Sequence, residues 1–393
     1  MAACPCFAAS GASMVTRTQR KTTLPAARSG CRVRRTLIWV GLLLLLGEVG
    51  LRARAHYLHG SNGLTESIDE RDPLLGYRLR PGTTVGGARR SLSINEWGFR
   101  GQQTPRTKPP GTTRVAVLGD SVTFGLEACS DESVWVARMT ARLNEASTTA
   151  RYDSINGGTR GYTLATGILQ LTERIAPFDP DIVIVPLFCS DVAAHARRQF
   201  AHSTEPVRTP AEPVLRDPPV SRFVQKHSLL RHLVSLNTVA FKAKYLAKRP
   251  QDRLDERGVA EYEARLQTVA DICRRRGWRL ILCTGCRAFG DDTAPTDQYT
   301  LAQTALAHNP SLSLAGLSDA YARYNEAIRR VATRNRVMLV DLDRIVPKRS
   351  DYFVDAVHLS DRGHRLVGEA VARAVIDEDK QASRTKRPPG HGI

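Results

Sequence analysis

Short apolar runs alternate with helical patterns along most of the chain after residue 113. Runs of four or five consecutive apolar residues, several of them β-branched, are typical of strands buried on both faces of a parallel sheet. Strand–helix alternation predicts a mainly parallel sheet with helices on both faces. The expected strands are 115–118, 152–155, 181–185, 279–283 and 337–340, and the expected helices are 133–145, 163–175, 260–275, 319–333 and 360–376.

The segments outside this pattern define the expected domain organisation. Residues 56–113 are rich in Gly, Pro and Arg without a sustained period, and we interpret them as an extended lead-in. The α/β domain then spans 114–376, with irregular insertions near 200–250 and 285–316. The polar residues 377–393 are expected to form a disordered tail.

An unbroken apolar run, Leu37–Gly47, stands near the N-terminus. Residues 1–35 before it carry seven positive charges and no acid, so this basic region is expected to stay in the cytoplasm. The run is short for a spanning helix and close to a signal-peptide core, and Ala53–Ala55 offers small residues for cleavage. Residues 36–55 are therefore a signal anchor or a signal peptide. Either alternative predicts an extracytoplasmic domain, held at the membrane or secreted.

The formal net charge of +18 does not predict a nucleic-acid partner. Part of the excess lies in residues 1–56, which hold nine Lys or Arg against Glu48 alone. The remainder is spread without the stripe of Arg and aromatic residues that nucleic-acid binders carry. The charge favours an anionic membrane surface or an acidic polymer instead.

The cysteines do not define a metal or redox site. Five cysteines follow the apolar run. Because five is an odd number, at least one thiol stays unpaired within the chain. Cys283 and Cys286 have redox-motif spacing, but they follow a late strand, and no second ligand pair with zinc spacing is visible. We expect no metal or organic cofactor. The five cysteines are Cys129, Cys189, Cys273, Cys283 and Cys286.

Candidate chemistry begins at Gly119-Asp120-Ser121, where the first buried strand ends and a helix begins. In an open α/β sheet, ligands bind at the carboxyl ends of the strands, close to helix N-termini. A serine at this turn is exposed, and nearby backbone N–H groups can stabilise an oxyanion. Taken alone, the tripeptide also fits a turn with a helix N-cap.

A second candidate group, Asp355 and His358, stands just before the last helix. The D-x-x-H spacing lets the carboxylate orient one imidazole nitrogen while the other takes a serine proton. His364 competes for this role, but it fits a position inside the last helix. We therefore expect Ser121, His358 and Asp355 to act as nucleophile, base and orienter.

Two further polar segments follow the second and third strands. Asn156–Thr163 contains Gly161, and Phe188–Asp191 contains Ser190. Parallel strands place both segments at the same sheet edge as Ser121. A backbone N–H and a polar side chain from these segments are expected to reach an oxyanion.

These four blocks resemble the SGNH (GDSL-type) hydrolases, whose name lists a Ser, a Gly, an Asn and a His. The resemblance covers about residues 72–376, including DPLLGYRLRPG and NEWGFRG, which occur in bacterial membrane-linked members. Within GDSVTFG, Ser121 matches the nucleophile; Gly161 matches the oxyanion glycine, and Asp355 and His358 match the orienter and the base. The resemblance implies a three-layer α/β/α fold with a flavodoxin-like sheet. It also implies hydrolysis or transfer of acyl groups on oxygen or sulfur esters.

One position departs from this family. The third block usually reads G-x-N-D, and here Ser190 occupies the Asn position. A short hydroxyl thus replaces an amide donor, and loss of such a donor costs about 10²–10³ in rate.

The sequence thus predicts an exported serine esterase with an oxyanion hole formed by Ser121, Gly161 and Ser190. Expected substrates are esters of small molecules, lipids or acylated glycans, including an O-acylated envelope polysaccharide. Two alternatives stay open. The chain is an acyltransferase on a polysaccharide, or it is a catalytically silent scaffold, which the serine at position 190 favours.

Overall fold

The structure is a computed structural model that describes residues 29–59, 68–87, 90–148, 150–200, 250–290, 293 and 295–385. The chain divides into two units, Met1–Val49 and Gly50–Ile393. Helix α1 (Ser29–His59) contains a stretch, Arg34–Arg54, with mean hydropathy 1.7 and no burial. Its 21 residues rise about 31 Å along the helix axis. This stretch is long and apolar enough to span a membrane.

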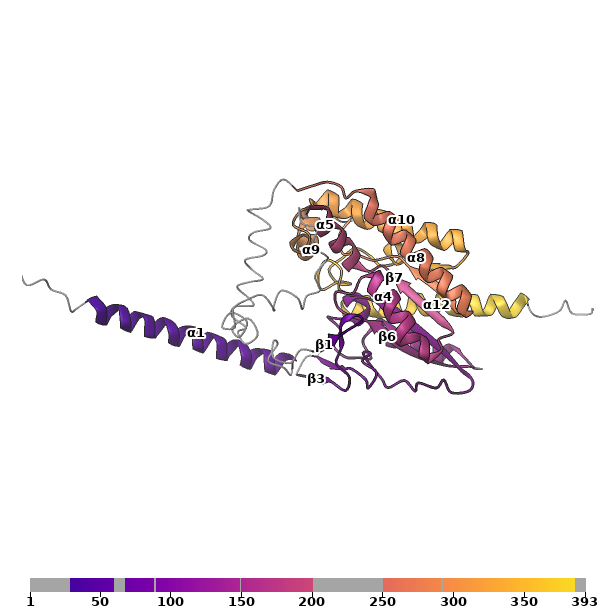
Figure 1. Ribbon diagram of the computed structural model, residues 1–393, viewed down its shortest axis with the longest axis horizontal. Helices are drawn as coiled ribbons and strands as arrows, with labels where there is room; N and C mark the ends of the chain where they lie inside the picture. Colours follow the sequence, from indigo (N-terminus) through magenta and orange to yellow (C-terminus); the bar gives the residue numbers. More distant parts are fainter. Residues whose placement is uncertain are drawn as a thin grey trace, which may run out of the picture. The chain divides into compact units, whose positions relative to one another are not determined.

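Five parallel strands form the central sheet in the order β6-β5-β7-β8-β9 (Figure 1). Numbered within the sheet, this order is 2-1-3-4-5, the flavodoxin-like arrangement. It confirms the predicted fold class. The strands are β5 (Thr112–Gly119), β6 (Arg151–Gly158), β7 (Ile182–Pro186), β8 (Arg279–Cys283) and β9 (Met338–Val340).

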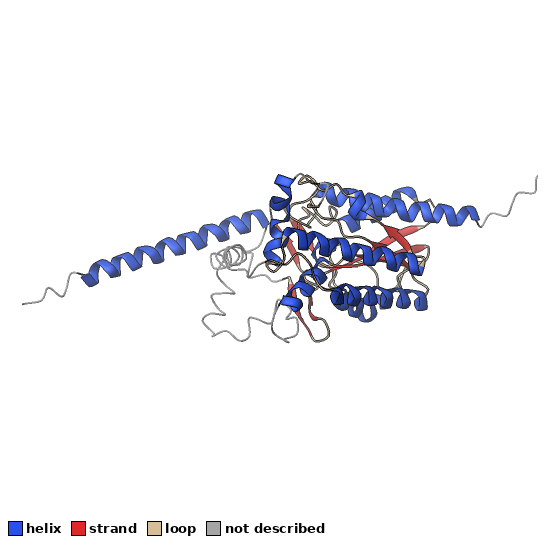
Figure 2. Cartoon of the chain, turned by 90° about the horizontal axis from the view of Figure 1, so that it is seen from above, coloured by secondary structure: helices blue, strands red, loops and turns tan. Residues whose placement is uncertain are grey.

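Helices cover both faces of this sheet, so the domain has three layers (Figure 2). The residues of β5 alternate: Val115 and Val117 pack with α3 (Trp135–Ala146) and α12 (Asp361–Thr385), whereas Ala116 and Leu118 belong to the other face's core. That other face is covered by α4 (Leu164–Gln170), α8 (Glu256–Arg276) and α10 (Leu314–Asn335). β7 is buried along its whole length, as its apolar run predicts.

Shorter elements complete the domain. The lead-in forms two antiparallel hairpins, β1 (Asp69–Asp72) with β2 (Gly76–Leu79) and β3 (Thr84–Gly86) with β4 (Ser91–Ser93). The remaining short elements are α2 (Ser121–Phe124), a π-helical turn (Leu171–Ile175), a 3₁₀ turn (Ala176–Phe178), α5 (Cys189–Phe200), α9 (Pro295–His308) and α11 (Leu342–Ile345).

Two expected irregular segments contain helix. Helix α9 lies within 285–316, because its apolar residues, buried Ala302 among them, pack on the core beside α10. Helix α12 continues beyond residue 376 to Thr385. Asp379 in this extension accepts hydrogen bonds from Tyr152 and Arg279, at 2.9 and 2.5 Å, which tie the helix to β6 and β8. The expected insertion at 200–250 lies outside the described residues except at its two ends.

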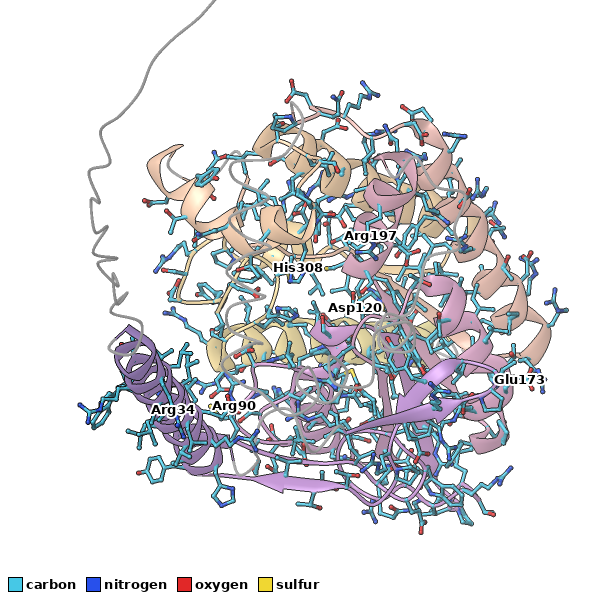
Figure 3. The ribbon with its side chains drawn as sticks, turned by 60° about the vertical axis from the view of Figure 1, so that its left-hand side comes forward. Arg34, Arg90, Asp120, Glu173, Arg197 and His308 are labelled. Atoms are coloured by element: carbon cyan, nitrogen blue, oxygen red, sulfur yellow. The ribbon has the colours of Figure 1, made fainter. Side chains whose placement is uncertain are left out.

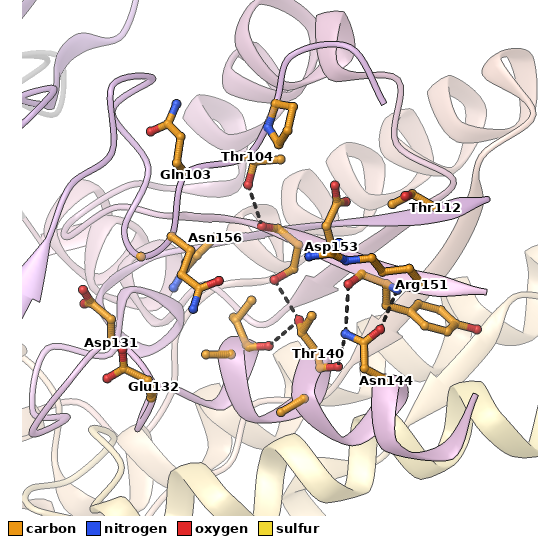
Figure 4. A pocket seen from close by; sticks show the side chains of 18 of the residues that line it. Gln103, Thr104, Thr112, Asp131, Glu132, Thr140, Asn144, Arg151, Asp153 and Asn156 are labelled. Carbon is orange, nitrogen blue, oxygen red and sulfur yellow. Dashed lines mark hydrogen bonds between the residues drawn. The ribbon is translucent and has the colours of Figure 1, made fainter. Parts of the chain in front are cut away.

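The outer strand β6 has its exposed edge partly covered by side chains (Figure 4). The Asn144 amide accepts from the Tyr152 N–H at 2.8 Å and donates to the Tyr152 carbonyl at 3.0 Å. The Thr104 hydroxyl donates to the Ser154 carbonyl nearby. These bonds replace those of a further strand and limit pairing with another chain. A groove of about 480 Å³ runs along this edge, and none of Ser121, Asp355 and His358 lines it.

A buried arginine joins the start of β5 to its neighbours. The Arg114 side chain is fully buried and pairs with Asp153 on β6 at 2.7 Å. It also donates to the carbonyl of Phe178 at 2.8 Å. The Asp153 carboxylate and the Phe178 carbonyl thus satisfy the buried Arg114 charge. These contacts hold β5 against β6 and against the 3₁₀ turn.

Candidate active site

The candidate site lies where the strand order reverses, between the carboxyl ends of β5 and β7. Ser121 follows β5 as the first residue of α2, and Ser190 follows β7 in the first turn of α5. This switch point is where open α/β sheets bind ligands. The topology thus brings together blocks that are far apart in sequence.

The side chains of Ser121, His358 and Asp355 form one hydrogen-bonded chain. The His358 Nε2 lies 2.8 Å from the Ser121 Oγ, and the His358 Nδ1 lies 2.8 Å from the Asp355 Oδ2. The second carboxylate oxygen, Oδ1, accepts from the backbone N–H groups of Val357 and His358, at 3.0 and 2.8 Å. The short D-x-x-H turn therefore fixes both the carboxylate and the imidazole.

The electrostatics of this chain favour a charged Asp355 and a basic His358. Burial raises the pKa of Asp355, but the hydrogen bonds from His358 and Val357 outweigh it and leave the pKa below its ordinary value. Burial lowers the pKa of His358, but the hydrogen bond to Asp355 and its charge leave the pKa above 6.5. The imidazole can thus accept a proton readily near neutral pH.

His364 does not belong to this chain. It lies inside α12, is buried, and its Nδ1 accepts from the Trp135 backbone N–H at 3.4 Å. Burial lowers the pKa of His364 to about 3, so the imidazole is neutral. Its contacts hold α3 against α12.

Glycines allow the end of β6 to approach the turn that carries Ser121. A Cβ on Gly158 would lie 2.2 Å from the Phe124 backbone nitrogen, and one on Gly157 would lie 2.8 Å from the Val117 carbonyl oxygen. The Asn156 amide donates to the Thr123 carbonyl at 3.0 Å. The doubled glycine is the sequence signal for this close approach.

The lead-in hairpin supports the loop that carries Gly161, a role that the sequence analysis missed. The Tyr77 hydroxyl donates to the Arg160 carbonyl, and the Tyr162 hydroxyl donates to the Tyr77 carbonyl. Gly161, which lies between Arg160 and Tyr162 in the sequence, has φ +77°, a conformation that glycine adopts without strain. The backbone N–H groups of Ser121 and Gly161 have no acceptor among the described residues.

The lead-in also positions the turn that carries Ser121, through Arg100 in the NEWGFRG segment. This buried side chain pairs with Asp131 at 2.8 Å. Its Nη1 donates to the carbonyls of Phe124 and Gly125, at 2.9 and 2.6 Å, where α2 ends. The Arg100 Nε and Nη1 groups thus donate to Asp131 and to the end of the turn, and these bonds tie the turn to the lead-in.

The structure places Ser190 beside Asp120 rather than facing open space. Its backbone N–H and its hydroxyl both donate to the Asp120 Oδ2, at 3.0 and 3.2 Å. Asp120 is itself buried, and burial raises its pKa although Val122 and Ser190 donate to it. A hydroxyl has one proton, so Ser190 has no second donor while it contacts Asp120.

The five cysteines that follow the apolar run are free thiols. Cys283 and Cys286 are both buried. Burial raises the pKa of Cys286 to about 12 and shifts the pKa of Cys283 in the same direction. Buried thiols with raised pKa are poor nucleophiles, because the thiolate is the reactive form.

The chain belongs to the GDSL-like lipase/acylhydrolase family, whose sequence profile matches residues 117–366. The protein is therefore an ester-hydrolysing enzyme, and the resemblance seen in the sequence is confirmed.

Solved structures similar to this chain have low sequence identity. An acetylxylan esterase from Geobacillus stearothermophilus is 16% identical over 67% of this chain and 94% of its own, with a TM-score of 0.41. A lipase/acylhydrolase from Enterococcus faecalis is 15% identical over 68% and 96%, with a TM-score of 0.40. An alpha/beta hydrolase from the metagenome of Lake Arreo, Spain, is 18% identical over 67% and 94%, with a TM-score of 0.40. No curated protein matches the chain.

Proposed function

We propose that the protein hydrolyses esters through an acyl-enzyme on Ser121, with His358 as general base and Asp355 as its orienter. The observation that carries this proposal is the unbroken chain Ser121–His358–Asp355, with two contacts of 2.8 Å. Nucleophile, base and orienter within hydrogen-bond reach form the arrangement used for acyl transfer on many folds.

The reaction proceeds in two steps. The Ser121 Oγ attacks the ester carbonyl while His358 takes its proton, and the proton then passes to the leaving alcohol. Water next attacks the acyl-enzyme, His358 accepts a water proton, and Ser121 leaves with that proton as the acid is released. In both steps Asp355 keeps the imidazole in one tautomer and stabilises the imidazolium.

The oxyanion hole is formed by the backbone N–H groups of Ser121 and Gly161, which have no other acceptor among the described residues. Ser190 adds a third contact only when its hydroxyl turns away from Asp120. Donors aimed at the developing negative charge act mainly in the transition state.

The proposed setting is the outer side of a membrane. Residues 36–55 anchor the enzyme, or act as a signal that is removed on secretion, and the basic residues 1–35 stay in the cytoplasm. The substrate is an ester-bearing small molecule, lipid or acylated glycan, and an O-acylated envelope polysaccharide fits this location. A reporter that is active only in the cytoplasm, fused after Ile393, is expected to be silent; the same fusion lacking residues 1–56 is its active control.

The catalytic assignment is tested with a fluorophosphonate probe, which labels activated serines. Wild-type protein should be labelled and should hydrolyse 4-nitrophenyl acetate, whereas Ser121→Ala should lose both with an unchanged melting temperature. Ser91→Ala, an exposed position in β4, is the matched control. Labelling that persists in Ser121→Ala would contradict the assignment, and absence of labelling in the wild type would support a silent scaffold.

A further inference from the structure

Contacts from β5 and from the lead-in fix the first part of the loop that carries Gly161. At the start of this loop, the Thr159 N–H donates to the Gly119 carbonyl at the end of β5, at 3.1 Å. Further along, the Tyr162 hydroxyl donates to a backbone carbonyl of the lead-in hairpin. The loop then enters α4, whose first residue is Leu164. Its end therefore needs a support of its own.

That support comes from Asp191, in the first turn of α5. The Asp191 Oδ2 accepts a hydrogen bond from the Leu164 backbone N–H at 2.7 Å. The side chain of Thr163, which precedes α4, makes no capping hydrogen bond to the described backbone of this helix. A carboxylate from another helix thus satisfies the first N–H of α4. Because α5 follows β7 and the loop follows β6, the bond joins segments after two strands that β5 separates in the sheet.

Asp191 is a buried carboxyl group, only 4% exposed. Its other oxygen, Oδ1, lies 3.5 Å from the Nη1 of Arg265 on α8, and Arg265 also pairs with Glu261 at 3.3 Å. Burial raises the pKa of Asp191 to about 7, whereas the Leu164 N–H and the Arg265 charge lower it. A buried carboxylate is costly unless it is hydrogen-bonded. The contact with Leu164 is the shorter of the two that this side chain makes with α4 and α8.

Ser190 and Asp191 are neighbours in sequence, but they contact different parts of the site. Ser190 donates to Asp120 at the end of β5, whereas Asp191 accepts from the start of α4. Helix α5 begins beside Asp120 and continues past Arg197, and both of these residues are labelled in Figure 3. The first turn of α5 thus links the turn that carries Ser121 to the loop that precedes α4.

We propose that Asp191 is a positioning residue, which aims the Gly161 backbone N–H at the oxyanion by holding the first N–H of α4. The inference rests on the proposed function, in which the Gly161 N–H is an oxyanion donor. Gly161 lies three residues before Leu164, so a shift of the helix start also shifts this donor. Misplacement of a catalytic group by about 1 Å costs about 10²-fold in rate. Asp191 acts through Gly161.

The test measures kcat and KM for 4-nitrophenyl acetate and the inhibition constant of phenylboronic acid. This acid forms a tetrahedral adduct with an activated serine and resembles the transition state. Asp191→Ala should lower kcat about 10²-fold and raise the inhibition constant by a similar factor, with little change in KM, because an oxyanion contact forms mainly in the transition state. Asp191→Asn keeps an acceptor oxygen with the same reach and should restore most of kcat.

Two further substitutions separate this role from helix stability. Ser313→Ala is the matched control, because the Ser313 Oγ accepts from the Gly316 N–H in the first turn of α10, at 3.0 Å, and α10 carries no candidate oxyanion donor. It should lower the melting temperature without changing kcat or the inhibition constant. Leu164→Pro removes the N–H that Asp191 binds, at a helix position that accepts proline. It should lower kcat relative to Leu164→Ala, which keeps the N–H.

Wild-type kcat and a wild-type inhibition constant in a folded Asp191→Ala protein would overturn the inference. If Asp191→Ala does not fold, equal kcat values in Leu164→Pro and Leu164→Ala would overturn it instead. A loss of kcat in Ser313→Ala as large as that in Asp191→Ala would also overturn it, because helix stability alone would then explain the effect. Failure of the proposed function is recognised separately, since the fluorophosphonate probe would then not label Ser121 in the wild-type protein.

Discussion

Replacing Gly158 with alanine should damage catalysis from a buried position outside the Ser121–His358–Asp355 chain. The added Cβ would lie 2.2 Å from the Phe124 nitrogen and 2.6 Å from the Thr123 carbonyl carbon. Carbon contacts are comfortable only from about 3.5 Å, so β6 and α2 must separate by about 1 Å. Both contacted atoms are backbone, and neither can rotate away.

The separation of β6 and α2 displaces the turn that carries Ser121. Asn156 and Arg100 fix the far end of this turn through the carbonyls of Thr123, Phe124 and Gly125. A displacement of about 1 Å would lengthen the 2.8 Å contact between Ser121 and His358 beyond hydrogen-bond range. Misplacement on this scale costs about 10²-fold in rate. Overpacking costs about 1–3 kcal/mol in the free energy of unfolding.

The assay is kcat with 4-nitrophenyl acetate, alongside the melting temperature and the rate of fluorophosphonate labelling. Gly86→Ala is the matched control, because a Cβ there meets nothing within 4 Å. We expect Gly158→Ala to lose about 10²-fold in both kcat and labelling rate, while Gly86→Ala keeps wild-type values. A Gly158→Ala protein with wild-type kcat would refute this account of the turn.

Three other changes test the site and the fold. In the proposed mechanism His358 must be neutral to act as the base, and its pKa is raised above its ordinary value, so kcat/KM should rise with pH through that pKa. Asp355→Asn should move this rise in kcat/KM to lower pH and reduce its maximum about 10³–10⁴-fold. An unmoved rise in the pH profile would argue against the Asp355–His358 pairing. Ser190→Asn supplies two donor protons and should raise kcat up to about 10²-fold with little change in KM, whereas a lower kcat in a well-folded variant would exclude position 190 from the oxyanion hole. Arg114→Met leaves Asp153 unpaired and should lower the free energy of unfolding, measured by urea titration, by about 3 kcal/mol. Adding Asp153→Leu should recover part of this loss. Wild-type stability of Arg114→Met would contradict the stabilising role of the buried pair.

Much of the fold was predictable, because strand and helix signals are local. The apolar run at 279–283 coincides with β8, and the alternation of strands and helices implied the layers before any contact was known. Local patterns were insufficient where tertiary contacts decide the structure. α9 and the last turns of α12 form in segments that look irregular or polar, because the rest of the domain supplies the surface on which they pack.

The sequence by itself indicated the candidate site and the chemistry proposed for it: a serine at a strand–helix turn, a D-x-x-H before the last helix and a glycine loop between them. Residue type and short spacing fix what these groups can do, whatever surrounds them. Only the tertiary structure decided which groups hold them in place. Arg100 and Tyr77 support the site from the lead-in, and the Ser190 hydroxyl faces Asp120. Such contacts join residues tens to hundreds of positions apart, and their geometry exists only when the sheet has brought the strand ends together.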